Sequence, residues 1–282
     1  MQQFAVLQLT GCAGCEVSLL NAEEWLEQYE LVYMPLVISA NSIPDVDILL
    51  VSGGVRTDED LVRLRRAAPK AKKVVAVGTC AISGGVANLG SRDEVHDLFL
   101  AEEGRRHLPR LLPECRSIAE VVPIQQTLPG CPPTPELFVR LLFPPKDLHM
   151  AKTVCQECDR KKQKTMRPRH LEGLLRGTVL PEICLINQGY LCIGTSTRGG
   201  CNAPCTRAGQ PCVGCRGPSE AFIHKGPESW LNTIEKVFSK MTDVPSNEIK
   251  AALRSPQLSL FLFQLSHDPS TGGHPGQEVE VL

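Results

Sequence analysis

The sequence predicts an α/β protein in two parts: a domain built on a parallel β-sheet over residues 1–145, and an irregular domain over residues 146–282. In the first part, short apolar runs rich in valine, isoleucine and leucine alternate with amphipathic segments. This pattern is typical of a parallel sheet covered by helices on both faces. After Pro144 and Pro145, long apolar runs become few, and eight of the thirteen cysteines crowd into residues 146–230. A segment of this composition buries little apolar surface, so metal ligation is expected to contribute to its folding.

Five apolar runs are the expected strands of the sheet. Glycines follow several of them closely, as is common where a strand gives way to a turn. The runs are Phe4–Leu9, Leu31–Ile38, Val46–Ser52, Val74–Val77 and, as the last strand, Ile118–Pro123.

Amphipathic segments predict the helices. Residues Val17–Tyr29 place Leu19, Trp25 and Leu26 on one apolar face. Thr57 is expected to cap a helix that reaches Ala68, because a threonine oxygen can accept the first free N–H groups and acidic residues follow it. Near the carboxyl end, residues 228–253 return to a helical pattern, and the tail from Ser266 is expected to be loosely held.

Composition excludes several classes of function. The chain carries 30 Lys and Arg against 31 Asp and Glu, so its net charge of −1 favours neither nucleic acid nor anionic lipid as a partner. Its longest apolar windows, such as Leu258–Leu265, are far shorter than a membrane span. The start at Met1 shows no export signal. We therefore expect a cytoplasmic protein without a direct membrane span.

The cysteines fall into three groups of four. The cytosol keeps thiols reduced, so cysteine at this density indicates metal ligation rather than disulfides, and the odd total of thirteen also fits poorly with full pairing. Four thiolates are the complement that one 4Fe–4S cluster needs. The first group is Cys12, Cys15, Cys80 and Cys131; the second is Cys155, Cys158, Cys184 and Cys192; the third is Cys201, Cys205, Cys212 and Cys215.

The first group follows the predicted strands directly or closely. Ligands of open parallel sheets bind in the crevice outside the carboxyl ends of the strands, where a flavodoxin-like domain holds its cofactor. Glycines precede these cysteines and let the backbone approach an inorganic core and donate N–H bonds to it. They are Gly11, Gly14, Gly78 and Gly130. The first cluster is therefore expected in that crevice, and three clusters in one chain indicate a path for single electrons.

These motifs resemble the small, electron-transferring subunit of nickel–iron hydrogenases over most of the chain. The resemblance rests on Gly11–Cys15, Gly78–Cys80, Pro129–Pro133, Gln188–Cys192 with Arg198–Cys201, and Pro211–Cys215. Within that family the sequence looks most like the cytosolic group, which includes the methyl-viologen-reducing hydrogenases and the sulfhydrogenases. The resemblance implies a flavodoxin-like domain over residues 1–145 and a domain with two further clusters over residues 146–282.

The resemblance also implies a role for each quartet. The first would hold the proximal cluster, next to the nickel–iron centre of a large partner subunit. The second would hold the distal cluster and the third the medial one, and a downstream iron–sulfur or flavin subunit would accept the electrons. A nickel–iron centre needs four thiolates, and outside the quartets only Cys115 remains, in a loop-like context. Hydrogen would therefore be split on the partner chain, and no catalytic residue is expected here.

This sequence departs from some relatives. Many exported relatives have histidine where this chain has Cys155, and some have only three cysteines in the third group, where Cys205 completes four here. The deazaflavin-reducing enzymes place an acidic residue after the third strand, whereas this chain has Ser52, Gly53 and Gly54. These departures favour three all-cysteine 4Fe–4S sites and weaken a deazaflavin-reducing assignment.

Two alternatives remain open. The Cys-x-x-Cys spacings in the second and third quartets also suit a structural zinc protein, although the dispersed first quartet does not. A quinone-module subunit of a complex-I-like enzyme would share the first domain, but such subunits typically lack the second and third quartets.

A basic run after Cys158 is either a solvated loop or a docking patch for the acceptor. The run consists of Arg160, Lys161, Lys162 and Lys164, with Arg167 and Arg169 close behind.

Overall fold

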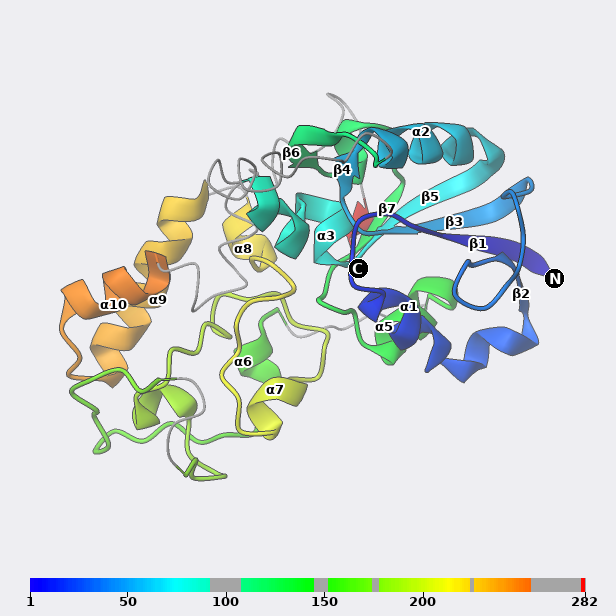
Figure 1. Cartoon of the computed structure of the whole chain (residues 1–282). Coiled ribbons are helices and arrows are strands. Elements are labelled where there is room, and N and C mark those ends of the chain that lie inside the picture. Colours follow the sequence, from blue (N-terminus) through cyan, green and yellow to red (C-terminus); the bar gives the residue numbers. More distant parts are fainter. Residues whose placement is uncertain (92–107, 145–151, 174–177, 224–225, 255–279, 282) are drawn as a thin grey trace. The chain divides into compact units, whose positions relative to one another are not determined.

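The computed structural model describes residues 1–91, 108–144, 152–173, 178–223, 226–254 and 280–281 (Figure 1). The chain divides into two compact units, the first comprising Met1–Lys146 with Pro269–Leu282, and the second Asp147–Asp268. The domain boundary expected at residues 145–146 stays a prediction, and Glu280–Val281 group with the first unit. The apolar run Leu258–Leu265 lies outside the described residues.

The first unit is built on a six-stranded sheet in which every neighbouring pair is parallel. Its strand order is β2-β1-β3-β5-β7-β8, and the first five strands reproduce the flavodoxin-like order. The strands are β1 Gln2–Gln8, β2 Tyr29–Tyr33, β3 Val46–Ser52, β5 Ala71–Val77, β7 Gln126–Leu128 and β8 Glu280–Val281. A separate antiparallel ribbon consists of β4 Val55–Thr57 and β6 Leu111–Arg116.

Side chains that alternate along the strands fill a core on each face of this sheet. Ala5 and Leu7 face the core that includes Leu64 of helix α2 (Asp58–Ala67). Phe4 and Val6 face the opposite core, which takes side chains from α1 (Gly14–Leu20) and α5 (Pro135–Leu142). Figure 1 shows α2 on one side of the sheet and α1 with α5 on the other. Continuous apolar strands are therefore needed, because both faces are buried.

Helix α2 begins where the sequence predicts it. The Thr57 hydroxyl accepts a hydrogen bond from the Asp60 N–H at 3.1 Å, and the Asp60 carboxylate accepts one from the Thr57 N–H at 3.0 Å. This reciprocal capping box satisfies donors that the first helical turn leaves free. Between β5 and β7 the chain also forms α3 (Gly78–Ser83) and two 3₁₀ turns, Gly85–Ser91 and Ile118–Glu120.

The prediction of one helix over Val17–Tyr29 is wrong. Helix α1 ends at Leu20, a 3₁₀ turn covers Glu23–Glu27, and Tyr29 already belongs to β2. The chain turns back at Ala22, where the backbone is extended, and the Trp25 indole N–H then donates to the Leu19 carbonyl at 3.1 Å. The same turn packs the Trp25 ring edge-on against Phe4 and leaves Leu26 58% exposed. Tertiary packing of one tryptophan therefore overrides the helical period.

Two predicted strands also differ from the structure. The run Leu31–Ile38 gives a strand only to Tyr33, because Pro35 cannot donate a ladder hydrogen bond. The run at residues 118–123 forms no strand: Ile118–Glu120 is a 3₁₀ turn, which begins at a second capping box made by Ser117 and Glu120. The strand before Cys131 is instead β7.

The described part of the second unit contains helices and isolated bridges but no strand. Its short helices are α6 Val154–Glu157, α7 Pro204–Arg207 and α8 Glu220–Ile223, with a 3₁₀ turn at Leu185–Gln188. The longer helices are α9 Gly226–Met241 and α10 Ser246–Arg254, within the segment predicted to be helical. Ile234, Phe238 and Ile249 from these two helices pack on a core that includes Cys192 and Cys212.

Hydrogen bonds, rather than a sheet, order the loops of this unit. Asn187 is fully buried and its amide donates to the carbonyls of Gln163 and Met166, both at 2.8 Å. Arg160 donates to the carbonyls of Thr206, Leu180 and Ile183. These side chains replace the backbone partners that a strand would supply.

We predict that Asp60→Ala destabilises the first unit strongly. The substitution removes the acceptor of the Thr10 hydroxyl at 2.8 Å and of the N–H groups of Arg56 and Thr57. Leaving such donors unpaired should cost about 2–3 kcal/mol, or roughly 5 °C or more in thermal midpoint. Thermal denaturation of the natively purified protein measures this. Glu59→Ala, in the same turn and exposed, is the matched control and should shift the midpoint little. Equal shifts in the two variants would contradict the prediction.

Candidate iron–sulfur sites

The first quartet converges on one hollow. Cys12, Cys15, Cys80 and Cys131 all line it, although up to 119 residues separate them in the sequence. Cys12 precedes α1 and Cys15 lies in its first turn; Cys80 lies in α3, after β5, and Cys131 follows β7. The hollow thus lies at the carboxyl ends of the parallel strands, where the strand order predicts a ligand. Its remaining lining comes from glycine backbone and from Ala13, Glu16, Ser52, Thr79 and Pro132.

Two glycines are required by this convergence. A Cβ atom on Gly78 would lie 2.5 Å from the Cys15 Sγ, and one on Gly85 would lie 2.8 Å from the Cys80 Sγ. Both residues also have positive φ angles, +81° and +50°, which favour glycine. Gly78 was expected from the sequence to serve the site, whereas Gly85 was missed because it follows its cysteine by five residues. The backbone at both positions leaves room for a bulky group between the thiols.

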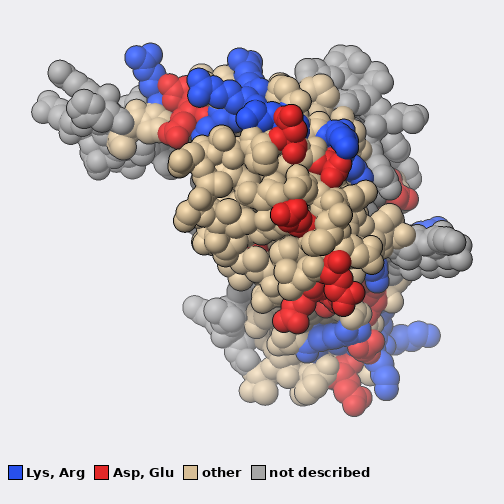
Figure 2. All heavy atoms as spheres, turned by 90° about the vertical axis from the view of Figure 1, so that its right-hand side faces the viewer, with Lys and Arg blue, Asp and Glu red and all other residues tan. Residues whose placement is uncertain are grey.

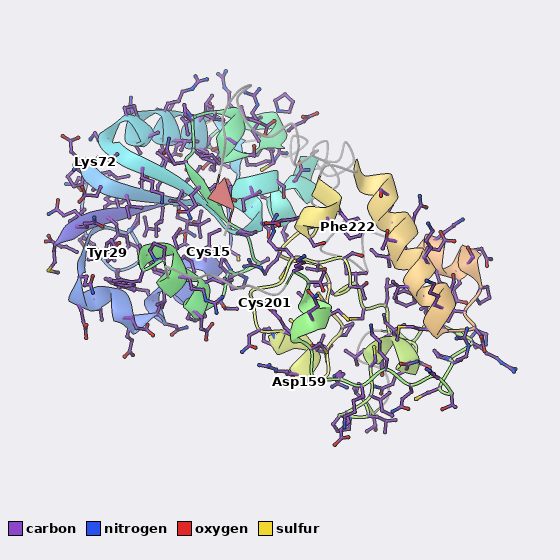
Figure 3. All side chains as sticks on the ribbon, turned by 180° about the vertical axis from the view of Figure 1, so that it is seen from behind. Cys15, Tyr29, Lys72, Asp159, Cys201 and Phe222 are labelled. Carbon is purple, nitrogen blue, oxygen red and sulfur yellow. The ribbon has the colours of Figure 1, made fainter. Side chains whose placement is uncertain are left out.

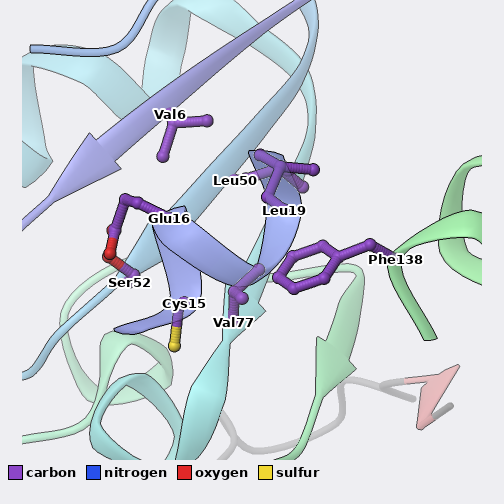
Figure 4. A pocket seen from close by; sticks show the side chains of 8 residues that line it. All are labelled: Val6, Cys15, Glu16, Leu19, Leu50, Ser52, Val77 and Phe138. Atoms are coloured by element: carbon purple, nitrogen blue, oxygen red, sulfur yellow. The ribbon is translucent and has the colours of Figure 1, made fainter. Parts of the chain in front are cut away.

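Burial dominates the electrostatics of this hollow. The pKa of Cys15 is raised far above its usual range, first by burial and then by Glu16 and the other three cysteines. A metal-free Cys15 is therefore a neutral thiol at neutral pH, and metal binding would have to displace its proton. The Glu16 side chain, only 2% exposed, accepts a hydrogen bond from the Ser52 hydroxyl. Figure 4 shows Glu16 reaching Ser52, while the Cys15 sulfur points away from the apolar side chains.

The thirteenth cysteine is not a surface thiol. Cys115 lies in β6, not in the loop expected from the sequence, and is fully buried. Burial raises its pKa to about 12, against the opposing effect of the nearby Arg56 guanidinium. Its Sγ occupies the space next to Gly54, where a Cβ atom would approach it to 2.5 Å. The burial of Cys115 is therefore explained by packing in the interior of the first unit.

Burial dominates the electrostatics of the second quartet as well. Burial, with smaller contributions from Cys184 and Cys155, raises the pKa of Cys192 to about 12 against the opposing N–H groups of Gly194 and Cys212. Cys184 also has a raised pKa from burial, opposed by the N–H groups of Ile186 and Asn187 that point at its sulfur. The fourth member, Cys158, ends α6 and packs on the same apolar core as Cys184 and Cys192.

The third quartet adjoins the second. Burial raises the pKa of Cys201 to about 11 and that of Cys212 well above its usual range, and both thiols interact with Cys215. The Cys212 N–H lies 3.3 Å from the Cys192 Sγ, so the backbone of one quartet donates to a sulfur of the other. Cys205 lies on α7 and is exposed. Figure 3 shows Cys201 among the loops of this unit.

Charged side chains that the sequence does not single out surround the third quartet. The Glu157 Oε2 lies 3.9 Å from the Cys201 Sγ, and its Oε1 accepts a hydrogen bond from the Gly200 N–H. Arg216, next to Cys215, is only 2% exposed. Burial lowers the pKa of Arg216 to about 10, against the opposing effect of Cys201. The sequence gives one signal of these charged neighbours, an arginine directly after the candidate ligand Cys215.

The first quartet fits the ligand set of a cubane cluster, because its four thiols line one hollow. Within the described residues, no three Cys, His, Asp or Glu side chains stand at the separation that a single metal ion requires. A 4Fe–4S cluster spreads its four thiolates over four irons, as the glycine-lined hollow of the first unit permits.

Two arginines of the basic run after Cys158 are bound within the fold, whereas its lysines are exposed. Arg160 binds three carbonyls of neighbouring loops, and Arg167 binds carbonyls at the end of α9 and the Asp243 carboxylate at 2.8 Å. Lys161 lies 3.9 Å from Glu182. Lys162 and Lys164 remain exposed, and Lys162 is close enough to Cys184 to oppose the rise in its pKa.

Comparisons with known proteins identify a family profile and relatives that this chain resembles. A family profile described as "NADH ubiquinone oxidoreductase, 20 Kd subunit" matches residues 12–144. The chain is 35% identical over 260 residues to the vhu G chain of the F420-non-reducing hydrogenase of Methanocaldococcus jannaschii, covering 85% of this chain and 90% of that one. It is 30% identical over 262 residues to the sulfhydrogenase 2 delta chain of Pyrococcus furiosus, covering 90% and 98%.

Solved structures agree with these relatives at the level of the fold. A chain of the actinobacterial-type NiFe-hydrogenase from Ralstonia eutropha matches with a TM-score of 0.52 at 18% identity, covering 98% of this chain and 93% of that one. No helix in the described ranges is long and apolar enough to cross a membrane. On the strength of the two relatives matched over most of their length, this chain belongs to the family of nickel–iron hydrogenase small subunits that includes the Methanocaldococcus jannaschii vhu G chain and the sulfhydrogenase 2 delta chain.

Proposed function

We propose that this chain relays single electrons between a hydrogen-splitting large subunit and a downstream acceptor, using three 4Fe–4S clusters. The observation that carries the proposal is the convergence of four thiols on one hollow at the strand ends. Cys12, Cys15, Cys80 and Cys131 would hold the proximal cluster. Cys155, Cys158, Cys184 and Cys192 would hold the distal cluster, and Cys201, Cys205, Cys212 and Cys215 the medial one.

When bound, such clusters would take up and release one electron at a time without breaking a bond. The residues of this chain would hold the iron, exclude water and set the potential. Buried thiols such as those of Cys192 and Cys212 keep water from the core of the second unit. The N–H groups of Ile186, Asn187 and Gly194 point at ligand sulfurs and would stabilise the electron-rich cluster.

An apolar surface supports the expected large partner, which would carry the nickel–iron centre. Val17, in α1 two residues beyond Cys15, is 52% exposed, and Leu26, Leu36 and Val37 are each at least 50% exposed. All four belong to the first unit. Figure 2, which views the molecule from the right-hand side of Figure 1, shows tan areas of uncharged residues, polar and apolar, that are interrupted by single acidic side chains. Exposed apolar residues next to a functional site are typical of a protein interface.

A second candidate is a quinone-module subunit of a complex-I-like enzyme, which the profile over residues 12–144 favours. That profile stops before the second and third quartets, whereas the hydrogenase relatives span both. The relay would operate in the cytoplasm, with an iron–sulfur or flavin subunit as acceptor. Native purification with identification of the companion subunits tests this assignment most directly.

The assembly can be tested at Val17. Expressed alone, the chain should be insoluble or poor in iron and without hydrogen uptake. In the native complex, Val17→Asp places a charge on the proposed interface and should lower the amount of large subunit that co-purifies by about tenfold. Val62→Asp is the control, because Val62 is a 44% exposed valine of the same unit on α2. Hydrogen-dependent dye reduction by this chain alone would refute the assignment.

The exit of electrons can be tested at the exposed lysines. Lys162→Glu with Lys164→Glu should slow reduction of the natural acceptor, because the pair would steer an acidic partner toward the distal cluster. Reduction of a small dye should change little. Lys236→Glu with Lys240→Glu makes the same charge change on exposed positions of α9 and should affect neither. If dye and natural acceptor slow equally, the lysines do not form a docking patch.

The third quartet can be tested at Cys205. Cys205→Ala should leave three thiolates and convert the medial site to a 3Fe–4S cluster, with an EPR signal in the oxidised state and a raised potential. The conservative change Cys205→Ser is the comparison variant, since serine can still ligate iron through oxygen. A stoichiometric 3Fe–4S signal in the unmodified protein would mean that Cys205 is not a ligand.

A further inference from the structure

Two arginines lie side by side next to the third quartet. The segments around residues 196–198 and 217–219 run antiparallel: the Arg198 N–H donates to the Gly217 carbonyl at 3.0 Å, and the Ser219 N–H donates to the Ser196 carbonyl at 2.9 Å. This pairing brings the segment of Arg198 beside that of Arg216, whose pKa is lowered first by burial and further by the Arg198 charge. Arg216 is almost fully buried.

The same pairing fixes α6 against these segments. The Val154 N–H donates to the Thr197 carbonyl at 3.0 Å, and Thr153 forms a bridge with Arg198. Glu157 at the end of α6 then reaches the Gly200 N–H and approaches Cys201. Glu157, Arg198 and Arg216 therefore come from three chain segments, and Glu220 is a second acidic residue that acts on Arg198.

Burying two like charges together is unfavourable unless an anionic group compensates them. A guanidinium stays protonated and cannot relieve the cost by losing its charge. Glu220 acts on Arg198, whereas Arg216 is the arginine whose charge acts together with Cys201, Cys215 and Glu157. Four thiolates would leave a cubane cluster with a net negative charge, and reduction would add one more.

We propose that Arg216, supported by Arg198, is a positioning residue that raises the reduction potential of the cluster on the third quartet. The inference rests on the proposed electron relay. A fixed positive charge in a low-dielectric interior stabilises the reduced cluster more than the oxidised one, and net charge is a recognised control of cluster potential. The step is a one-electron transfer from the neighbouring cluster, in which no bond forms or breaks and the guanidinium keeps its protons.

The experiment uses the native complex with Cys205→Ala as a reporter, because its 3Fe–4S EPR signal would distinguish the third site from the other two. In this background, Arg216→Gln should shift the EPR redox titration to lower potential. We expect about a tenfold fall in the equilibrium constant for reduction, which is about 59 mV for one electron. Arg198→Gln should shift it in the same direction. Arg216→Lys keeps the charge and should stay near the reporter's own value.

Arg207→Gln is the matched control. Arg207 is an exposed arginine two residues from Cys205 and pairs with Asp159 at 3.1 Å, so solvent screens its charge and the potential should hold. Iron content is measured for every variant. If the reporter shows no 3Fe–4S signal, the third quartet itself is wrong and the relay fails with it.

Three results would overturn the inference while leaving the relay intact. The first is an unchanged potential in Arg216→Gln at full iron content. The second is an equal shift in Arg216→Lys and Arg216→Gln, which would assign the effect to packing. The third is loss of the third cluster from both of these variants, which would make the role of Arg216 purely structural.

Discussion

Convergence of thiols from distant chain segments is the constraint on which the first unit depends. Cys12, Cys80 and Cys131 follow three different strands, and only a parallel sheet brings the carboxyl ends of those strands to one edge. Both faces of the sheet must then be covered, which requires the continuous apolar strands and the helices on each side. The close approach of backbone to sulfur at Gly78 and Gly85 follows from the same convergence.

The described part of the second unit holds its cysteines in position without a sheet. Its cysteines belong to the apolar core themselves, with Cys192 and Cys212 among its buried residues. Burial raises the pKa of these thiols, so the metal-free protein holds neutral sulfurs in an apolar setting. Metal binding there would therefore be coupled to deprotonation and to folding, and the N–H groups that point at the sulfurs would favour the ligating state. Asn187 and Arg160 complete the unit by binding the carbonyls of its loops.

Charge is distributed unevenly between the candidate sites. The first hollow contains a buried carboxylate, Glu16, whereas the third quartet has two arginines and Glu157. Clusters with identical ligands would thus experience different fields. A relay needs such differences, because potentials set the direction in which electrons move. Relatives at 30% identity and above establish the family, while the field around each quartet is a property of this chain's own side chains.

The sequence by itself determined the family and the parallel-sheet class, because these depend on residue type and spacing along the chain. Its grouping of twelve cysteines stays a prediction, and the structure brings the first four of them to one hollow. The sequence also predicted the start of α2, since a capping box is local. It misplaced the helix at residues 17–29 and the last strand, where the packing of Trp25 on Phe4 and the turn at Ser117 override local periodicity. Only the tertiary structure decided that Gly85 and Glu157 lie beside the cysteines and that Arg216 and Cys115 are buried. Such neighbours meet through contacts between distant segments, and residue spacing carries no record of them.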